Sequence, residues 1–318
     1  MKISFVIPCY NTTRAIREVL KEIELSMEKR NDDSYEIILV NDCSPNPDTI
    51  KILLEMVKEK DFITLVDLSK NSGQPNAILA GCMYATGDYI MTSDDDGQTQ
   101  LDKLDEFIQA IESGYDVVCA KYTSRVQKSL FRRFGSFVNR KMADWLIERP
   151  KDVYMSTIFI AKRFVVEEMI QYDQPYAYIS GLILRITQNV GNVEMEQRDR
   201  AVGESGYTLK KLMSLWLNGF TAFSIKPLRV ADLIGGITAF VGVAVAVITI
   251  IRKLLDSSIQ AGWSSMIAVL LITSGLHLLL LGFVGEYVGR CYMCINKTPQ
   301  YVVRKVYQKQ EGENVDEI

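Results

Sequence analysis

The sequence predicts an α/β domain built on a mostly parallel sheet, followed by a two-helix transmembrane hairpin. Strand and helix patterns alternate over the first 120 residues, which is typical of βαβ units. Two runs without Asp, Glu, Lys or Arg then cover residues 233–251 and 257–285. A membrane-spanning helix needs about 20 apolar residues, so each run is long enough to cross a bilayer.

The elements of the α/β domain follow one another with short connections. Residues 3–8 form a short apolar strand that ends at a proline, and residues 14–25 repeat apolar side chains at helical spacing. Residues 36–40 are continuously apolar, as expected for a parallel strand that is covered on both faces. The remaining elements are a helix at 49–59, a strand at 63–68, a helix at 74–86 and a strand at 89–92.

The bulk composition excludes several classes of protein. The chain has 318 residues, 48% of them hydrophobic, which is ample for a folded core and excludes disorder over most of its length. A formal net charge of −3 gives no reason to expect a nucleic-acid partner. Six cysteines without a secretory signal pattern do not indicate a disulfide-linked secreted scaffold.

The uncharged runs predict transmembrane helices at 232–252 and 260–286, with both outer ends on one side of the bilayer. Basic residues are more frequent outside these ends than in the turn, which carries only Arg252 and Lys253. The positive-inside rule therefore places residues 1–208 and the tail, 287–318, in the cytoplasm. Residues 209–231 are expected to lie in the membrane interface, and the polar end at 311–318 is expected to fray. The alternative is two buried helices of a large soluble core.

Polar side chains stand where three of the predicted strands end, at residues 9–11, 41–42 and 93–96. Ligands of open α/β sheets bind at the carboxyl ends of the strands, so these clusters outline one crevice. The sequence holds no G-x-G-x-x-G and no P-loop, which disfavours a dinucleotide enzyme or an ordinary NTPase.

The acidic run after the fourth strand carries a candidate metal site. In an extended segment Asp94 and Asp96 point to the same side and Asp95 to the other. Two convergent carboxylates suit Mg²⁺ or Mn²⁺, which bridges a diphosphate and neutralises its charge as it leaves. The alternative is a solvated acidic turn.

An ordered series of motifs resembles the family 2 glycosyltransferases of the GT-A fold, which is Rossmann-like and binds nucleotide-diphospho-sugars. The motifs of the α/β domain are VIPCYN at 6–11, VNDCS at 40–44, NSGQ at 71–74 and DDDGQ at 94–98. Later motifs resemble the polyprenyl-phosphate branch, which includes dolichyl-phosphate mannose synthase, bactoprenol glucosyltransferases and undecaprenyl-phosphate aminoarabinose transferases. They are RAVGESGY at 200–207, KPLR at 226–229 and GEYVGR at 285–290. The paired spans match the bacterial members, which implies the bacterial inner membrane.

The resemblance implies roles for individual residues on the donor side. Pro8, Tyr10 and Asp42 would hold the nucleoside, and Gly73 and Gln74 would lie in the nucleotide-facing loop. Within the same donor site, Asp94 and Asp96 would hold the metal ion and diphosphate. The resemblance also places Asn11 and Asp95 in the donor site, and it places Gln98 beside the sugar. Two positions depart from the family pattern, because Thr12 replaces a usual Glu and Asn41 a usual Asp.

The acceptor side is predicted in a basic segment at 121–140, in which arginines alternate with phenylalanines. Arg binds phosphate in a bidentate manner, and the resemblance places Arg125, Arg132 and Ser136 on the lipid phosphate. Arg200 is a second phosphate candidate. The alternative is an amphipathic helix lying on an anionic membrane surface.

The combined prediction is an inverting, metal-dependent transfer of a sugar from a nucleotide donor, best a UDP-sugar, to a polyprenyl phosphate such as undecaprenyl phosphate. A lipid phosphate is already anionic at neutral pH, so no catalytic base is required, and Asp152 is only a weak candidate. The relatives with this hairpin imply a homo-oligomer, with a tetramer favoured. The alternatives are a processive synthase, a transferase for another membrane lipid, and an inactive membrane-anchored protein that binds sugar nucleotides.

Overall fold

The computed structural model describes residues 1–30, 32–97, 99–123, 150, 153–174, 177–196, 226–255, 262–296, 299–309 and 315–317. The chain divides into two compact units. Unit 1 combines Met1–Leu209 with Lys297–Ile318, and unit 2 is Lys210–Asn296. Unit 1 is therefore discontinuous in sequence, and it contains all the catalytic residues that the sequence predicts.

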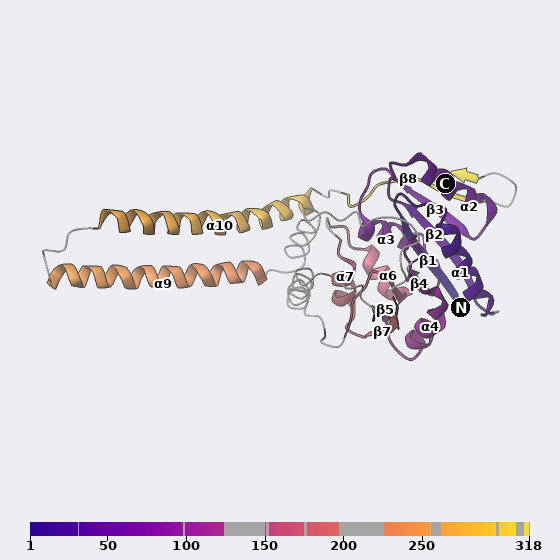
Figure 1. Ribbon diagram of the computed structural model, residues 1–318, viewed down its shortest axis with the longest axis horizontal. Coiled ribbons are helices and arrows are strands. Elements are labelled where there is room, and N and C mark those ends of the chain that lie inside the picture. Colours follow the sequence, from indigo (N-terminus) through magenta and orange to yellow (C-terminus); the bar gives the residue numbers. More distant parts are fainter. Residues whose placement is uncertain are drawn as a thin grey trace. The chain divides into compact units, whose positions relative to one another are not determined.

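Unit 1 is built on a mixed sheet with the strand order β7-β5-β6-β4-β1-β2-β3-β8-β9 (Figure 1). Strands β4, β1, β2 and β3 are parallel to one another, whereas β6 and β8 run antiparallel to their neighbours. The strands are β1 (Lys2–Cys9), β2 (Ser34–Asn41), β3 (Ile63–Leu68), β4 (Tyr89–Thr92), β5 (Val117–Tyr122), β6 (Phe159–Lys162), β7 (Val190–Met195), β8 (Val303–Lys309) and β9 (Val315–Glu317).

Helices cover both faces of this sheet. They are α1 (Ile16–Glu28), α2 (Pro47–Glu59), α3 (Gln74–Cys82), α4 (Leu104–Glu112), α6 (Arg163–Ile170) and α7 (Ile179–Ile186), with a 3₁₀ turn at Leu101–Lys103. Apolar residues of α1, α2 and α4 form one core with the side of β1 that carries Ile3, Phe5 and Ile7. The opposite side of β1 and β2 contacts α3, which in turn contacts α6. The predicted mostly parallel α/β fold is confirmed.

The close approach of α3 to the sheet depends on Gly81. A Cβ atom at this position would lie 2.5 Å from Cγ1 of Val6 and 2.8 Å from Cγ2 of Val40. Only a residue without a side chain therefore lets the helix rest on β1 and β2. The same helix carries Gln74 at its first position, so this contact places that side chain at the ends of the strands.

The C-terminal tail differs from its prediction, because residues 303–309 form β8 and residues 315–317 form β9. Strand β8 pairs with β3, and β9 pairs with β8, so the expected fraying of 311–318 is wrong for the last strand. Without β8, β3 would expose a row of unpaired backbone groups at the sheet edge, which favours pairing. Val306 of β8 is buried there.

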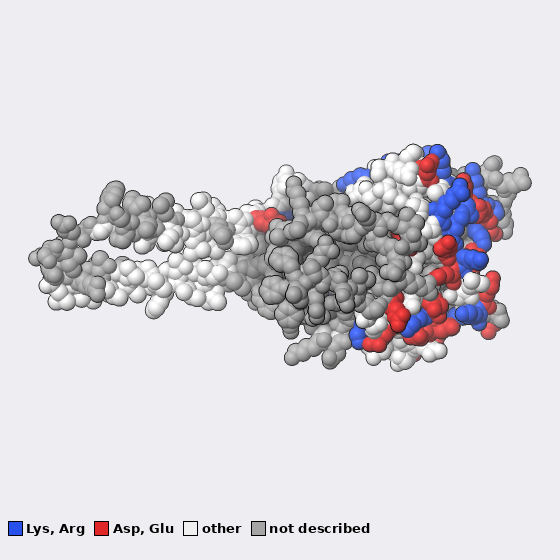
Figure 2. Space-filling model, in the orientation of Figure 1, with Lys and Arg blue, Asp and Glu red and all other residues white. Residues whose placement is uncertain are grey.

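Unit 2 is described by two long helices, α9 (Lys226–Leu255) and α10 (Trp263–Ile295), which lie side by side in opposite directions (Figure 1). Their described side chains are apolar and exposed over most of their length, and they are mostly white, which means uncharged, in Figure 2. Phe240 is 77% exposed and Ile272 is 71% exposed. In the described residues one stretch, Ile272–Ile295, is long and apolar enough to cross a membrane, and Leu233–Val245 is a shorter apolar stretch.

Helix α10 extends beyond the predicted end at residue 286. Arg290 Nη2 lies 2.7 Å from Glu286 Oε1, one helical turn away. Such pairs stabilise a helix, which explains why the helix continues past the uncharged run.

Candidate active site at the carboxyl ends of the parallel strands

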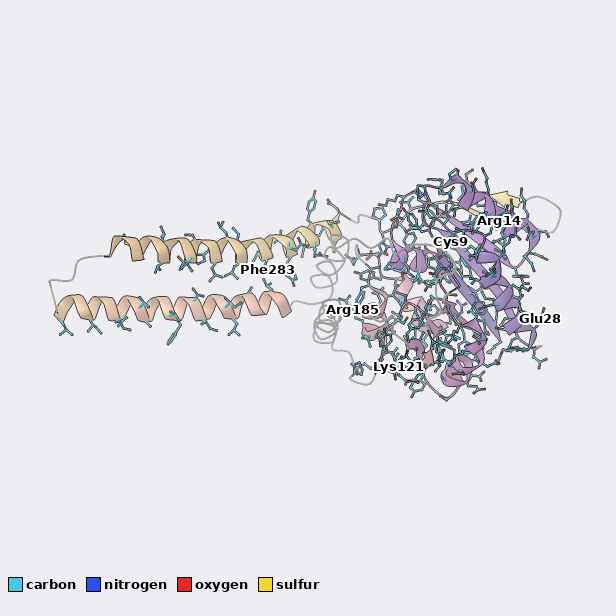
Figure 3. All side chains as sticks on the ribbon, in the orientation of Figure 1. Cys9, Arg14, Glu28, Lys121, Arg185 and Phe283 are labelled. Atoms are coloured by element: carbon cyan, nitrogen blue, oxygen red, sulfur yellow. The ribbon has the colours of Figure 1, made fainter. Side chains whose placement is uncertain are left out.

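The carboxyl ends of β3, β2, β1 and β4 lie next to one another in the sheet. Because the chain leaves β1 for β2 and β3 and then returns to β4, the strand order reverses between β1 and β4. Such a switch point is where open α/β sheets bind ligands. Cys9, labelled in Figure 3, marks the end of β1, and Asp94, Asp95 and Asp96 follow the end of β4.

Asp42, directly after β2, orders the loop that leads into α3. Its Oδ1 accepts a hydrogen bond from the backbone N–H of Ser72 at 2.6 Å, and its Oδ2 one from Gly73 at 2.8 Å. Gly73 has φ +86°, a conformation that favours glycine. Burial raises the pKa of Asp42, and the two backbone hydrogen bonds oppose this shift. The structure thus brings Asp42 and Gly73 together.

Gln74 joins this loop to the acidic run. Its Nε2 donates a hydrogen bond to Asp94 Oδ1 at 3.0 Å. Two predicted site residues, one from the start of α3 and one from the end of β4, are therefore in contact.

Asp95 has partners that differ from those of Asp94. Its carboxylate accepts a short hydrogen bond from the Thr12 hydroxyl and a backbone hydrogen bond from Tyr10. Burial and the charge of Asp96 raise the pKa of Asp95, against the lowering effect of these hydrogen bonds. Thr12 is itself buried. The Thr12 side chain therefore ties the end of β1 to the acidic turn.

Pro8, Tyr10 and Asn11 form the end of β1 and the turn after it. Tyr10 is 50% exposed, which leaves its ring available to a ligand. Asn11 has φ +54°, and its backbone N–H donates to Ser44 Oγ at 3.0 Å. The turn that presents Tyr10 is thus held by the loop after β2.

Two tyrosines that the sequence reasoning missed are Tyr122, which lies close to the acidic run, and Tyr154, which interacts with Tyr122. Burial raises the pKa of Tyr122, at the end of β5, and the charges of Asp94 and Asp96 raise it further. Tyr154 also contributes to this shift. The side chain of Asn192 in β7 holds the backbone of Tyr154. Asn192 Oδ1 accepts a hydrogen bond from the Tyr154 N–H at 2.8 Å, and Asn192 Nδ2 donates one to the Tyr154 carbonyl at 2.7 Å. These contacts join segments far apart in sequence, so no local pattern could have indicated them.

A hydrogen-bond chain that the sequence reasoning also missed runs beside the nucleoside candidates. Asn41 Nδ2 donates to Asp67 Oδ1 at 2.7 Å, and Asn41 Oδ1 accepts from Ser44 Oγ at 2.7 Å. Asp67 Oδ2 accepts from Arg304 Nη1 of β8 at 3.3 Å. An amide at position 41 is needed here, because it donates on one side and accepts on the other.

Several predicted residues lie outside the described part of the chain. They are Gln98, Arg125, Arg132, Ser136 and Arg200, together with Asp152. Within the described part, no group of three or more His, Cys, Asp or Glu side chains is placed to hold a metal ion. Asp94 and Asp96 are a half-buried pair of carboxylates beside Tyr122, and paired carboxylates are the oxygen ligands that Mg²⁺ and Mn²⁺ prefer.

Comparison with protein families matches residues 4–174 to "Glycosyl transferase family 2" and residues 226–291 to "GtrB C-terminal hairpin". The chain is 32% identical over 96% of its length to the uncharacterized glycosyltransferase YkcC of Bacillus subtilis, covering 94% of that protein. It is 30% identical over 96% of its length to undecaprenyl-phosphate 4-deoxy-4-formamido-L-arabinose transferase of Photorhabdus laumondii, again covering 94%.

A solved structure supports the predicted GT-A fold. Glucosyl-3-phosphoglycerate synthase from Mycobacterium tuberculosis, in complex with Mn²⁺, UDP and glucosyl-3-phosphoglycerate, aligns with a TM-score of 0.50. The sequence identity is 17%, over 68% of this chain and 76% of that one. At this identity the likeness concerns the fold alone.

Proposed function

The chain belongs to glycosyl transferase family 2, and from that premise we propose that it moves a sugar from a UDP-sugar to undecaprenyl phosphate. That it is a glycosyltransferase follows from the family and from its relatives. The observation that carries the finer proposal is the contact of Gln74 with Asp94, at the switch point of the sheet. It joins the nucleotide-facing loop to the acidic run, as a site for a nucleoside diphosphate requires.

On the donor side, Tyr10 and Asp42 hold the nucleoside in this proposal, with Pro8 and Asn11 shaping the turn. Tyr10 offers an exposed ring for stacking. Asp42 holds the backbone of Ser72 and Gly73, which orients the start of α3 toward the diphosphate. A helix N-terminus favours anions, since its backbone N–H groups point outward. UDP is the nucleotide of this proposal because the motif series resembles the polyprenyl-phosphate transferases; the complex of the solved structure with UDP shows only that a protein of this fold binds UDP.

The residues present fit a divalent cation. Asp94 and Asp96 would supply two hard oxygen ligands to Mg²⁺ or Mn²⁺. Such an ion would supply positive charge to balance the charge that develops on the departing diphosphate. Asp95 is engaged by Thr12 and so keeps the acidic turn in place. Gln98 would lie beside the sugar.

On the acceptor side, the proposal places the lipid phosphate on Arg125, Arg132, Ser136 and Arg200. The support is the name of the relative, an undecaprenyl-phosphate transferase that aligns over 96% of this chain, and the hairpin family matched at 226–291. Residues 232–252 and 260–286 would cross the bacterial inner membrane, with 209–231 in the interface. Residues 1–208 and 287–318 would be cytoplasmic, and the protein would form a homo-oligomer, best a tetramer.

The reaction needs little acid–base chemistry from the protein. A phosphate oxygen of the acceptor forms a bond to the anomeric carbon while the bond from that carbon to the diphosphate breaks on the opposite side, which inverts the configuration. The nucleoside diphosphate leaves with the electron pair. Because a phosphate monoester is anionic at neutral pH, with a second pKa of about 6, no base is required. The residues bind and orient the two substrates.

A transfer assay tests the proposal. Membranes containing the full chain are incubated with Mn²⁺, undecaprenyl phosphate and a panel of radiolabelled UDP- and GDP-sugars. Label is expected in the lipid phase with one UDP-sugar and is expected to be absent with Asp94→Asn. If no donor labels the lipid, the transferase proposal is wrong. If undecaprenol accepts the sugar as well as its phosphate does, the acceptor assignment is wrong.

A further inference from the structure

We propose that Arg304, on the C-terminal strand β8, is a positioning residue of the nucleotide site. It acts through Asp67 and Asn41 on the two turns that carry Tyr10 and Asp42. The inference rests on the proposed function, since it takes those turns to be the nucleoside-binding part of the donor site. It extends that site to a segment that follows unit 2 in the sequence.

An irregularity in β8 puts Arg304 where it can act. Leu68 of β3 is paired with Val303, and Asp67 is paired with Lys305, so Arg304 is the extra residue between two paired positions. Bulges of this kind redirect a side chain and recur next to active sites. Here the extra residue stands at the carboxyl end of β3, the edge of the sheet that holds the candidate site.

The guanidinium of Arg304 joins the ends of β2 and β3. Its Nη1 donates to Asp67 Oδ2 at 3.3 Å, and its Nη2 donates to the Ser69 carbonyl at 3.1 Å. Nη2 also lies 4.0 Å from Cys43 Sγ, next to Asp42. Asp67 is buried with a 6% exposed side chain, whereas Arg304 is 51% exposed. The buried carboxylate therefore needs partners, and the arginine supplies a charged one from the surface.

The effect passes from Asp67 to β1 through hydrogen bonds. Asp67 holds the Asn41 amide at 2.7 Å, and that amide in turn accepts from Ser44 Oγ at 2.7 Å. Ser44 Oγ accepts from the backbone N–H of Asn11 at 3.0 Å. This chain crosses the ends of four adjacent strands, β8, β3, β2 and β1.

The turns after β1 and β2, which these hydrogen bonds reach, need such support. Asn11 and Cys43 have φ values of +54° and +50°, in the left-handed region that residues other than glycine adopt at a cost. Each stands next to a nucleoside candidate, Tyr10 or Asp42. Loss of Arg304 loosens the Asp67–Asn41–Ser44 chain, so it should weaken nucleotide binding more than it slows sugar transfer.

The test compares Arg304→Met with Arg30→Met in the full chain in detergent. Arg30 serves as a control, because its guanidinium also joins two partners, the carboxylates of Asp33 at 2.7 Å and Asp105 at 2.9 Å, but near the start of β2. UDP and GDP are titrated by calorimetry with Mn²⁺, and transfer kinetics are measured with the active sugar donor. Arg304→Met is expected to raise the nucleotide Kd and the donor KM by about 3- to 10-fold. The kcat and the acceptor KM should stay within about twofold.

Two further variants separate positioning from simple structural damage. Arg304→Lys keeps a charge for Asp67 but has a single nitrogen in place of Nη1 and Nη2, which contact Asp67 and Ser69, so its Kd should lie between those of wild type and Arg304→Met. Asp67→Asn keeps an acceptor for Asn41 but removes the charge. Combining it with Arg304→Met should add little to either single effect.

The possible results distinguish a wrong proposed function from a wrong role for Arg304. If the wild type binds neither nucleotide, the proposed function is wrong and the inference falls with it. If the wild type binds but Arg304→Met matches Arg30→Met in Kd and KM, the inference alone is wrong. A lower melting temperature with unchanged Kd would assign Arg304 a structural role only and would also overturn it.

Discussion

The side-chain amide of Gln74, at the first position of α3, donates a 3.0 Å hydrogen bond to the carboxylate of Asp94, just after β4. The bond connects two strand ends that lie on either side of β1 in the sheet. One carboxylate of the acidic run is thereby oriented by the first residue of α3. The contact also makes the geometry of the acidic run depend on where α3 rests.

Replacing Gln74 tests this dependence. Gln74→Ala removes a hydrogen bond to a charged group, which contributes about 1.5 kcal/mol, so kcat/KM for the donor should fall about tenfold. Gln74→Glu should cost more, because a second carboxylate would face Asp94. Steady-state transfer kinetics measure both, with Gln109→Ala on the exposed side of α4 as the control. Equal activity of all three variants would contradict the role of the contact.

Gly81 allows α3 to pack closely against β1 and β2. In Gly81→Ala the new methyl group would meet Val6 Cγ1 at 2.5 Å and Val40 Cγ2 at 2.8 Å. Overpacking of this kind costs about 1–3 kcal/mol, so the melting temperature and the donor affinity should both fall. Adding Val6→Ala should restore part of each. Gly236→Ala in α9 should leave the affinity for UDP unchanged, because among the described residues nothing beyond its chain neighbours and the adjacent backbone of α9 lies within 4 Å of the new Cβ.

The buried amide of Asn41 should not tolerate its acidic isostere. Asn41→Asp would face the Asp67 carboxylate, which now accepts the Asn41 amide at 2.7 Å, and would lose the donor of that bond. We expect a loss of about 1–3 kcal/mol in the free energy of unfolding, measured by denaturant titration in detergent. Asn41→Asp combined with Asp67→Asn should recover most of it. Asn46→Asp, at the N-cap of α2, is the control, since Asp caps a helix as well as Asn does.

Asp95 should give the protein a pH-dependent stability. Its folded pKa is raised by burial and by the charge of Asp96. The folded state therefore binds a proton more readily than the unfolded chain does. This group's favourable contribution is fully present below the unfolded value, about 3.9, and is lost as pH rises through the raised folded pKa.

Melting curves of the wild type and Asp95→Asn between pH 4 and pH 8 measure this effect. The melting temperature of the wild type, relative to that of the variant, should be higher at low pH and should level off above the raised pKa. Two curves that stay parallel over the whole range would show that Asp95 does not titrate as described.

The first four strands and three helices were predictable because each carries its own periodic signal. The apolar run at 36–40 lies within β2 (Ser34–Asn41), and the predicted strand at 63–68 is β3 itself. The placement of Asp42 and Asp94 at one edge followed from one rule, that parallel strands end at a common edge, whereas Gly73 was a candidate only through the family resemblance. Helix α3 ends at Cys82, four residues before its predicted end, which shows that apolar spacing places boundaries less well than elements.

The contacts of Arg304 were not predictable in the same way. Asp67 and Arg304 are 237 positions apart, and Arg304 resembled a basic residue that follows a membrane span. Nothing in the sequence near 303–309 indicates that this segment adds a strand beside β3. Tyr122 was missed for a similar reason, since its neighbours Asp94 and Asp96 come from a different strand end. Local patterns predict elements, whereas contacts between distant segments depend on the assembled sheet.

The discontinuity of unit 1 has a consequence for the order of synthesis. When residue 209 has been added to the chain, β3 still lacks its second neighbour, β8, and 93 further residues must be added before Val303 of β8 is made. At a translation rate of about 5–20 residues per second, the open edge persists on the order of ten seconds. The chain can therefore complete its catalytic sheet only after its helical hairpin has been synthesised, so a polypeptide truncated within the hairpin would be left without Arg304 and with β3 exposed.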